Sequence, residues 1–597
     1  MDRQILDLES LLRVPHVDPD GVEISPDGKQ LAFSWNVTGQ WEIYTLALDS
    51  VTSPKLITSG PGAKSNPCWS PDGKQLAYAF DIDGSEAFDI YSHIIDTDVH
   101  INLTPETADA IQANFCWSPD SKHIAFISDR SDRFKTYILS LENGAIRLIH
   151  DKQSPENVSW SPDGRWLTIV AAATGQDYWT FIVSIAENTF KPISEKGLAI
   201  AADNAVWSPD SSQVAFCSSH EELFRVGIYS LASGQINWMT DEVEKGKECL
   251  SWSPDGQTLV YITSYEALTE IALLMLETGE LTTYWVAAGV HHTPHFFPDG
   301  KNIVFVFENP CFPGDLWRLA LDNGSFQQLT HSLTTELENC QFVMPTNVNY
   351  PSLDGKSVPA VLYRPSSPKE KPPAVIYIHG GPTWLTQFSW DPLVQHMVSQ
   401  GWVVLAPNYR GSTGYGLQWQ LANRFDLGNG DTKDVVAGAD YLCNEGLSDP
   451  KRIAITGRSW GGYLTMTSMT EYPDRWAAGS AVVPFLNWFT GHANSRQDLQ
   501  QWDLENMGDP VKDYDRYHQY SPFFFLDRIQ APVQMICGTH DIRCPASESV
   551  EAKEVLVKQG QECDLVIYKD EGHRFLKIEN VVDAIQRQMK FLADSLK

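Results

Sequence analysis

The chain has 597 residues, of which 42% are hydrophobic and 11% aromatic, a composition typical of large ordered cores rather than of disorder. Its formal net charge of −32 at pH 7 argues against nucleic acid or an anionic membrane as a partner. The N-terminus carries acidic residues where a signal peptide needs a basic start, and no apolar run is long enough for a membrane helix. The ten cysteines form no C-x-x-C pairs, so we expect reduced thiols and a cytoplasmic protein.

The first 17 residues are predicted to form a short helical segment. Ile5, Leu8 and Leu12 would share one helical face. We expect this segment, residues 1–17, to pack on the C-terminal domain.

A turn motif recurs through the next three hundred residues. Ser-Pro-Asp followed by Gly or Ser begins at six positions: Ser25, Ser70, Ser118, Ser161, Ser208 and Ser253. Residues 297–300 (FPDG) are a seventh variant, and each turn precedes a short apolar strand. Pro fixes φ, Asp bonds its own backbone and Gly accepts a positive φ, so the motif forms a tight turn. A period of 40 to 50 residues with several short strands predicts an all-β seven-bladed propeller over residues 18–335.

Three histidines near the seventh turn raise the question of a metal. His291, His292 and His295 lie close together in the sequence, but no cysteine or carboxylate pattern accompanies them. We predict that they are strand or loop histidines, and that the protein uses neither a metal nor another cofactor.

From residue 336 the repeat gives way to alternating strands and helices, which predicts a mostly parallel sheet with flanking helices. The expected strands are residues 374–378, 402–406, 452–456, 533–537 and 565–568. The expected helices include residues 434–442 and 581–596. We therefore assign residues 336–597 to one α/β domain.

One strand of this domain leads directly into Gly457-Arg458-Ser459-Trp460-Gly461, after which a helix is expected from residue 462. A strand, a sharp turn and a helix are the setting in which G-x-S-x-G is a nucleophile elbow. The alternative is a glycine-rich turn with an idle serine, and the five-residue pattern alone does not exclude it.

A serine nucleophile needs a base, and the base needs an acid to orient it. In α/β-hydrolases these groups follow in the order Ser, Asp or Glu, His, each in a loop after a strand. Ser459, Asp541 and His573 fit this order and placement. The oxyanion hole would use the backbone N–H of Trp460 and a second donor from the loop at residues 379–382 (HGGP).

These motifs together resemble the prolyl oligopeptidase family of serine peptidases, in its acylaminoacyl-peptidase and dipeptidyl/aminopeptidase-like branch. The matching segments are residues 379–382 (HGGP), 408–412 (NYRGS), 457–463 (GRSWGGY), 541–543 (DIR) and 571–573 (EGH). The resemblance covers the whole chain, because family members place a propeller before an α/β-hydrolase domain.

The resemblance implies that Ser459, Asp541 and His573 are the triad and that Gly381 and Trp460 supply the oxyanion N–H groups. The family's prolyl-specific branch has an oxyanion tyrosine where this chain has His379, which weakens a strictly prolyl-cleaving assignment. Arg543 matches a position that contacts the substrate's backbone carbonyl in relatives; a salt bridge that holds the Asp541 loop is the alternative. No counterpart of the glutamate pair that dipeptidyl peptidases use to hold a free N-terminus is evident.

The leading hypothesis is a serine peptidase that hydrolyses short peptides, of acylaminoacyl-peptidase, aminopeptidase or dipeptidyl-peptidase type, with the propeller restricting substrate size. An esterase or amidase acting on small non-peptide molecules would use the same triad. A third hypothesis is a non-enzymatic scaffold, which the intact triad disfavours. A homo-oligomer is compatible with the sequence, which does not reveal the oligomeric state.

Overall fold

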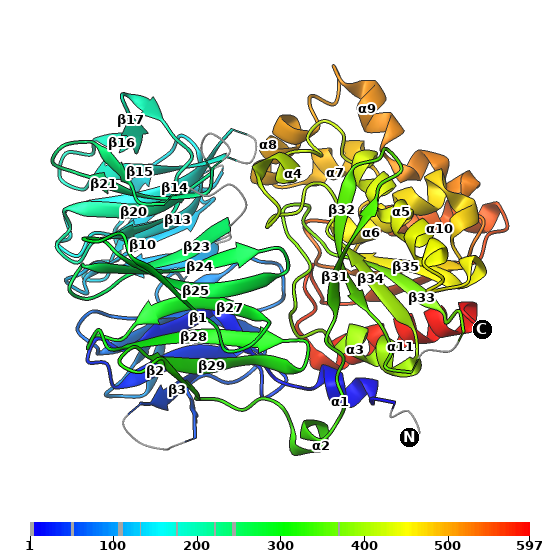
Figure 1. Ribbon diagram of the computed structural model, residues 1–597. Helices are drawn as coiled ribbons and strands as arrows, with labels where there is room; N and C mark the ends of the chain where they lie inside the picture. The colour runs from blue at the N-terminus through cyan, green and yellow to red at the C-terminus, as the bar shows by residue number, and fades with distance from the viewer. Residues whose placement is uncertain are drawn as a thin grey trace.

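The computed structural model contains a ring of seven four-stranded antiparallel sheets beside a domain built on one eight-stranded sheet (Figure 1). It describes residues 5–48, 53–105, 111–131, 133–174, 177–219, 223–240, 246–367 and 370–597. The predicted fold class is confirmed: an all-β seven-bladed propeller precedes an α/β-hydrolase domain. The boundaries at residues 17/18 and 335/336 stay predictions of the sequence.

Each propeller blade takes four strands in chain order. The first three blades contain β1 (Val17–Ile24), β2 (Gln30–Trp35), β3 (Glu42–Ala47), β4 (Lys55–Leu56), β5 (Ala63–Trp69), β6 (Gln75–Asp81), β7 (Asp89–Ile94), β8 (Val99–Asn102), β9 (Ile111–Trp117), β10 (His123–Ser128), β11 (Lys135–Ser140) and β12 (Ile146–His150). The fourth and fifth contain β13 (Ser154–Trp160), β14 (Trp166–Thr174), β15 (Asp177–Ser184), β16 (Phe190–Pro192), β19 (Asp203–Trp207), β20 (Gln213–Ser218), β21 (Arg225–Ser230) and β22 (Ile236–Trp238), with β17 (Ser194–Glu195) and β18 (Leu198–Ala199) pairing separately between them. The last two contain β23 (Gly246–Trp252), β24 (Thr258–Tyr265), β25 (Leu268–Met275), β26 (Leu281–Tyr284), β27 (Val290–Phe296), β28 (Asn302–Asn309), β29 (Phe312–Ala320) and β30 (Ser325–Gln328).

The repeated turn stabilises the hairpin between the first two strands of a blade. In six blades the motif's serine Oγ donates to the aspartate two residues later at 2.6–2.7 Å. The same oxygen accepts from a backbone N–H after the turn, as Ser118 does from His123 at 2.9 Å. The motif therefore satisfies most of its own polar groups locally, and in two turns the aspartate N–H also donates to a serine in the turn of the next blade.

Contacts between blades close the ring. The indole N–H of Trp117, at the end of the first strand of its blade, donates to the carbonyl of Cys68 in the preceding blade at 3.0 Å. A Cβ at Gly28, in the turn of the first blade, would lie 3.3 Å from Cδ of Pro298 in the turn of the seventh. The first and last blades thus meet through packing, and no strand is exchanged between them.

The second domain has the eight-stranded sheet order β31-β32-β34-β33-β35-β36-β37-β38. Its strands are β31 (Thr346–Pro351), β32 (Ser357–Tyr363), β33 (Ala374–Ile378), β34 (Val403–Pro407), β35 (Ile453–Arg458), β36 (Ala478–Val482), β37 (Val533–Gly538) and β38 (Cys563–Tyr568). The first two pairings are antiparallel, β31 with β32 and β32 with β34, and all later ones are parallel. The parallel strands carry the expected loops at their carboxyl ends, the edge at which α/β proteins place their sites.

Helices cover both faces of this sheet. The helices are α2 (Thr335–Glu338), α3 (Pro392–Gln400), α4 (Leu417–Gln420), α5 (Gly430–Asn444), α6 (Trp460–Glu471), α7 (Trp488–Asn494), α8 (Gln497–Asn506), α9 (Tyr514–Gln519), α10 (Ala546–Lys558) and α11 (Ile578–Ser595), with 3₁₀ turns at Pro450–Arg452, Pro473–Arg475 and Pro522–Arg528. One core joins the sheet to α5, α6 and α10. A second core joins the opposite face to α3, α11 and the N-terminal helix α1 (Leu8–Leu12).

The N-terminal segment is helical over fewer residues than predicted. Only Leu8–Leu12 form α1; residues 1–4 lie outside the described residues. The predicted apolar face is also wrong, because Ile5 is 59% exposed while Leu8 and Leu11 are buried. Leu6 instead bonds to α3, since its N–H donates to Ser399 Oγ at 3.0 Å and its carbonyl lies 2.8 Å from Nδ1 of His396.

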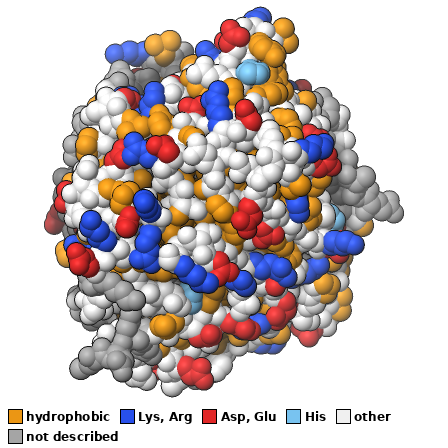
Figure 2. Space-filling view, turned by 90° about the vertical axis from the view of Figure 1, so that its right-hand side faces the viewer, with side chains coloured by type: hydrophobic (Ala, Val, Ile, Leu, Met, Phe, Trp, Pro, Cys, Tyr) orange, Lys and Arg blue, Asp and Glu red, His pale blue; other side chains and the backbone are white. Residues whose placement is uncertain are grey.

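The outer face of the hydrolase domain carries acidic and basic side chains interspersed over the surface (Figure 2). All ten cysteines are free, in agreement with the expectation of reduced thiols. None of the described helices combines the length and the apolar character that crossing a membrane requires.

Candidate active site

The serine predicted as nucleophile sits on a strained corner between β35 and α6. Ser459 has φ 58° and ψ −120°, a conformation that is uncommon for a residue other than glycine. Backbone bonds hold it there, because its N–H donates to Val482 at 2.9 Å and its carbonyl accepts from Tyr463 at 2.9 Å. The strain is stored at the end of a buried strand, where the hydroxyl is presented to a cavity.

The glycines of the motif are required by close backbone contacts. A Cβ at Gly461 would lie 2.2 Å from the carbonyl oxygen of Ile378, at the end of β33. A Cβ at Gly457 would lie 2.5 Å from the carbonyl carbon of Gly461. These distances are too short for any side chain, so the turn can be made only with glycine at both positions.

The three predicted triad side chains meet at this corner. Nε2 of His573 lies 2.9 Å from Oγ of Ser459. Nδ1 of the same ring lies 3.0 and 2.9 Å from the two carboxylate oxygens of Asp541. A hydroxyl, an imidazole and a carboxylate in this chain of contacts can act as nucleophile, base and orienting acid; these roles remain predictions.

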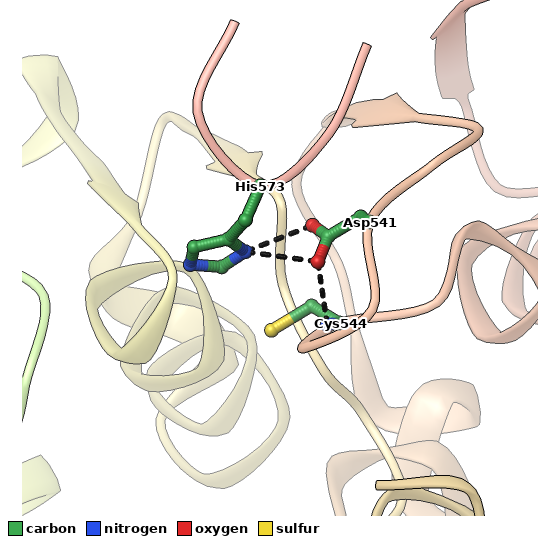
Figure 3. A group of neighbouring side chains, drawn as sticks. All are labelled: Asp541, Cys544 and His573. Carbon is green, nitrogen blue, oxygen red and sulfur yellow. Dashed lines mark hydrogen bonds and ion pairs between the residues drawn. The ribbon is translucent and has the colours of Figure 1, made fainter. Parts of the chain in front are cut away.

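The loop after β37 fixes the carboxylate of Asp541. Oδ1 accepts the backbone N–H groups of Arg543 at 2.9 Å and of Cys544 at 2.8 Å, and the side chain is fully buried. Figure 3 shows this carboxylate between the imidazole of His573 and the backbone of Cys544. No motif in the sequence points to Cys544, whose thiol adjoins the triad.

Asp541, Cys544 and His573 each offer one ligand atom within 4.8 Å of the others, the only metal-like group among the described residues. The carboxylate and Nδ1 that a metal would need already bond to each other. We therefore interpret the group as part of the triad. The histidines at residues 291–295 lie in β27, as predicted, where His291 bonds to Thr269 and His292 to Glu308.

The predicted oxyanion loop adjoins the serine. A Cβ at Gly380 would lie 3.5 Å from Cβ of Ser459, so the loop after β33 packs against the elbow. Gly381 has φ +129°, which only glycine adopts easily. The ring of His379 stacks on Tyr409 at a centroid distance of 4.3 Å, and its Nε2 lies 3.0 Å from Ser412 Oγ. The ring of His379 is thus held by Tyr409 and Ser412 and anchors the loop. The candidate donors to the oxyanion remain the backbone N–H groups of Gly381 and Trp460.

A cavity of about 810 Å³ lies between the propeller and the hydrolase domain, and Ser459 opens into it. The part formed by the hydrolase domain is aromatic, with Trp460, Phe485, Trp488 and Trp502 in its lining. Rings of Trp460 pack on Phe485 at 5.7 Å and on Trp488 at 5.8 Å. This wall suits an apolar or aromatic side chain next to the reacting carbonyl.

The part formed by the propeller carries several carboxylates, together with Lys247 and His292. Asp20, Asp203 and Glu248 line it, from three different blades. Burial and the nearby charge of Glu248 raise the pKa of Asp203 to about 6. Burial also raises the pKa of Glu248 and of Asp20. A cationic group in the cavity would relieve the repulsion among these carboxylates.

Arg543 lines the cavity that Ser459 faces. Its guanidinium forms a two-pronged ion pair with Glu86 of the propeller, at 2.6 to 3.0 Å. The structure therefore contains a salt bridge of Arg543, and a contact of this side chain with substrate stays a prediction.

Glu86, the partner of Arg543, belongs to a propeller loop that packs against the hydrolase domain. Asp81 is buried and accepts backbone N–H groups of Asp83, Gly84 and Glu86. A Cβ at Gly84 would lie 3.3 Å from the backbone N of Gly572, beside His573. The loop at residues 81–86 therefore docks the second blade on the loops that carry Asp541 and His573.

Comparison with known proteins relates the C-terminal part of the chain to a family of peptidases. Residues 386–597 match the model of the prolyl oligopeptidase family. The chain is 27% identical over 295 residues to the uncharacterized peptidase YuxL of Bacillus subtilis, covering 49% of this chain and 44% of the relative. It is 29% identical over 210 residues to the acylamino-acid-releasing enzyme of Arabidopsis thaliana, covering 34% of this chain and 27% of the relative. The matched stretches thus span less than half of either relative.

Structural similarity to known proteins covers more of the chain than these sequence matches do. A crystal structure of puromycin hydrolase superposes with a TM-score of 0.87 at 19% identity, covering 99% of this chain and 96% of that one. At this identity the likeness concerns the fold of both domains together and does not extend to the substrate.

Proposed function

We propose that the chain is a serine peptidase of the prolyl oligopeptidase family, whose model residues 386–597 match, and that it hydrolyses short peptides through an acyl-enzyme on Ser459. The observation that carries the proposal is the contact of 2.9 Å between Ser459 Oγ and His573 Nε2 at the edge of the interdomain cavity. The free state of all ten cysteines supports a cytoplasmic location as part of the same proposal.

In the proposed reaction, His573 Nε2 takes the hydroxyl proton while Oγ of Ser459 attacks the carbonyl carbon of the scissile bond. Backbone N–H groups of Trp460 and Gly381 stabilise the negative oxygen that forms. The proton then passes from His573 to the leaving amine, and the carbon–nitrogen bond breaks. A water molecule, which gives a proton to His573, then attacks the acyl carbon. The ester bond to Oγ breaks, His573 returns the proton to Ser459, and the acid product is released. Asp541 holds the ring and stabilises its positive charge.

The propeller is proposed to select substrates by size. Ser459 faces a cavity whose other wall is the propeller, and the loop at residues 81–86 packs on the catalytic loops. A folded protein would have to separate the two domains to bring a peptide bond to Ser459, whereas a short peptide would fit inside. Opening by domain separation would then contribute to turnover.

The two walls of the cavity favour particular peptides. The aromatic wall suits an apolar side chain, and the acidic wall of Asp20, Asp203 and Glu248 favours a positively charged group. We therefore propose that peptides with a free amino terminus are cleaved faster than the same peptides acylated. This favours the aminopeptidase or dipeptidyl-peptidase type over the acylaminoacyl-peptidase type.

A substrate panel tests these proposals. Free and acetylated aminoacyl and dipeptidyl anilides, small esters and puromycin would be compared by kcat/KM. We expect the free dipeptidyl or aminoacyl anilides to lead, and the ratio of free to acetylated substrate to fall as the pH drops through about 6, where Asp203 becomes protonated. The ratio cancels effects common to both substrates, such as the protonation of His573. Cleavage of esters alone would favour an esterase instead.

The size restriction has its own test. One peptide that is cleaved well would be offered free in solution and within a surface loop of a stable folded protein. Loss of cleavage in the embedded form supports the restriction, and equal rates for both forms contradict it.

A further inference from the structure

A second cavity, of about 380 Å³, lies behind the elbow at the junction of the two domains. It is lined by the N-terminal segment, the first propeller blade, β35 and α11, and it shares no lining residue with the cavity that Ser459 faces. Nothing in the proposed reaction uses it.

Two guanidinium groups face this cavity, each beside a triad residue. Arg458 precedes Ser459 and Arg574 follows His573, and both line the cavity. The side chain of Arg458 donates to the backbone carbonyl of His573. Arg574 lies over the ring of Trp41 at 5.0 Å. Burial, followed by the positive charge of Arg574, lowers the pKa of Arg458, which indicates that the two groups repel each other.

No carboxylate among the described residues forms an ion pair with either arginine. Asp391, the one acidic residue in the lining, instead accepts the backbone N–H of Val394 at 3.0 Å as the cap of α3. His16 adds no charge at neutral pH, because burial and the charge of Arg574 lower its pKa to about 4. The charge of Asp541 acts on Arg458, and Arg574 acts on Asp18 and Asp20, but none of these three carboxylates lines the cavity. The lining itself therefore carries two arginines and, apart from Asp391, no acidic side chain.

The rest of the lining is largely apolar. Leu393 from α3 and Val581 and Ile585 from α11 contribute to it. Its volume lies within the range of about 300 to 1,000 Å³ that small-molecule sites occupy. Arginine pairs bind carboxylates through parallel hydrogen bonds, which suits an anion held between two guanidinium groups.

We propose that this cavity binds an amphipathic organic carboxylate, with its anionic group between Arg458 and Arg574 and its apolar body against α3 and α11. Bound there, the carboxylate would neutralise the repulsion between the two arginines and link the segments that carry Ser459 and His573. The ligand is therefore expected to act as an effector of the enzyme rather than as its substrate.

Calorimetric titration of the full chain with octanoate tests the proposal. We expect saturable binding with Kd below about 1 mM, and much weaker binding of acetate, which lacks the apolar body, and of octanol, which lacks the charge. Because heat is measured rather than turnover, the result is independent of whether the proposed peptidase activity is found. No saturable binding of octanoate, or equal binding of octanol, would overturn the proposal.

Three variants locate the site. Arg574→Gln removes one charge and should weaken octanoate binding at least tenfold. Val581→Phe fills the apolar part, leaves both arginines in place, and should also weaken binding. Arg587→Gln changes an arginine of the same helix that pairs with Asp583 outside the cavity, and should leave binding unchanged. Circular dichroism would verify folding of each variant, and undiminished binding by folded Arg574→Gln and Val581→Phe would contradict the assignment.

Discussion

The propeller uses the same serine–aspartate turn in six of its seven blades, whereas the hydrolase domain uses each of its motifs once. In a blade, the serine and aspartate of a turn are two residues apart and satisfy each other. At the candidate active site, His573 contacts a serine 114 residues away and an aspartate 32 residues away. A change in a propeller turn should therefore have a small, local effect, and a change at the elbow should affect the whole site.

The largest expected effect is on turnover. Ser459→Ala should lower kcat by about a million-fold, on the scale of nucleophile loss in a serine peptidase, while the fold is retained. Steady-state assays with the best anilide would measure it. Ser595→Ala, whose hydroxyl bonds to the carbonyl of Phe591 at the end of α11, is the control and should be fully active. Labelling of Ser459→Ala by a phosphonate probe would show that another residue is the nucleophile.

A pair of glycine substitutions sharpens the comparison between the two domains. Gly461→Ala would place a Cβ 2.2 Å from Ile378 O and should destabilise the protein by at least about 3 kcal/mol. Gly73→Ala, in a propeller turn with φ +69°, meets nothing within 4 Å and should cost about 1–2 kcal/mol from backbone strain alone. Urea denaturation of both variants would measure the difference, and equal losses would contradict the contrast.

A partly buried carboxylate between blades makes stability depend on pH. Burial raises the pKa of Glu23 from 4.5 to about 7, and its carboxylate accepts the N–H of Trp69 at 2.6 Å. The folded state therefore holds the proton of Glu23 more tightly than the unfolded state does. The contribution of this group to the free energy of unfolding is complete below about pH 4.5 and is lost as the pH rises through 7, by up to about 3 kcal/mol.

Glu23→Gln should remove this dependence. Thermal unfolding at pH 5 and at pH 8 should then show a smaller difference than in the unmodified protein. Glu142→Gln, at an exposed position, is the control and should behave like the unmodified protein. An unchanged difference in Glu23→Gln would show that Glu23 is not the responsible group.

The smallest effect is expected where the two domains meet. Glu86→Gln removes the ion pair with Arg543, a partly exposed contact worth about 0.2–1 kcal/mol. Opening should become easier by at most about fivefold, so that cleavage of a peptide embedded in a folded protein rises relative to the free peptide. Glu187→Gln, on an exposed propeller turn, should leave this ratio unchanged. A ratio equally unchanged in Glu86→Gln would exclude this contact from the gate.

Much of the fold was predictable because its signals are local. The predicted strand at residues 374–378 coincides with β33. The strand before Ser459 and the helix after it begin within two residues of their predicted first residues. Alternation of apolar residues and turn-forming Pro, Asp and Gly act over a few residues, so a single sequence displays them. Of the helix predicted for residues 1–17, only Leu8–Leu12 are helical among the described residues, and Leu6 hydrogen-bonds to α3 instead.

The sequence by itself determined the number of blades, the order of Ser459, Asp541 and His573, and the strand–turn–helix around the serine. Only the tertiary structure decided that Glu86, 457 residues from Arg543, pairs with it, and that Arg458 and Arg574 face one cavity. The physical reason is that a turn or a strand follows from short-range sterics and hydrogen bonds. Contacts between domains depend on how two finished surfaces pack, and no local pattern encodes that.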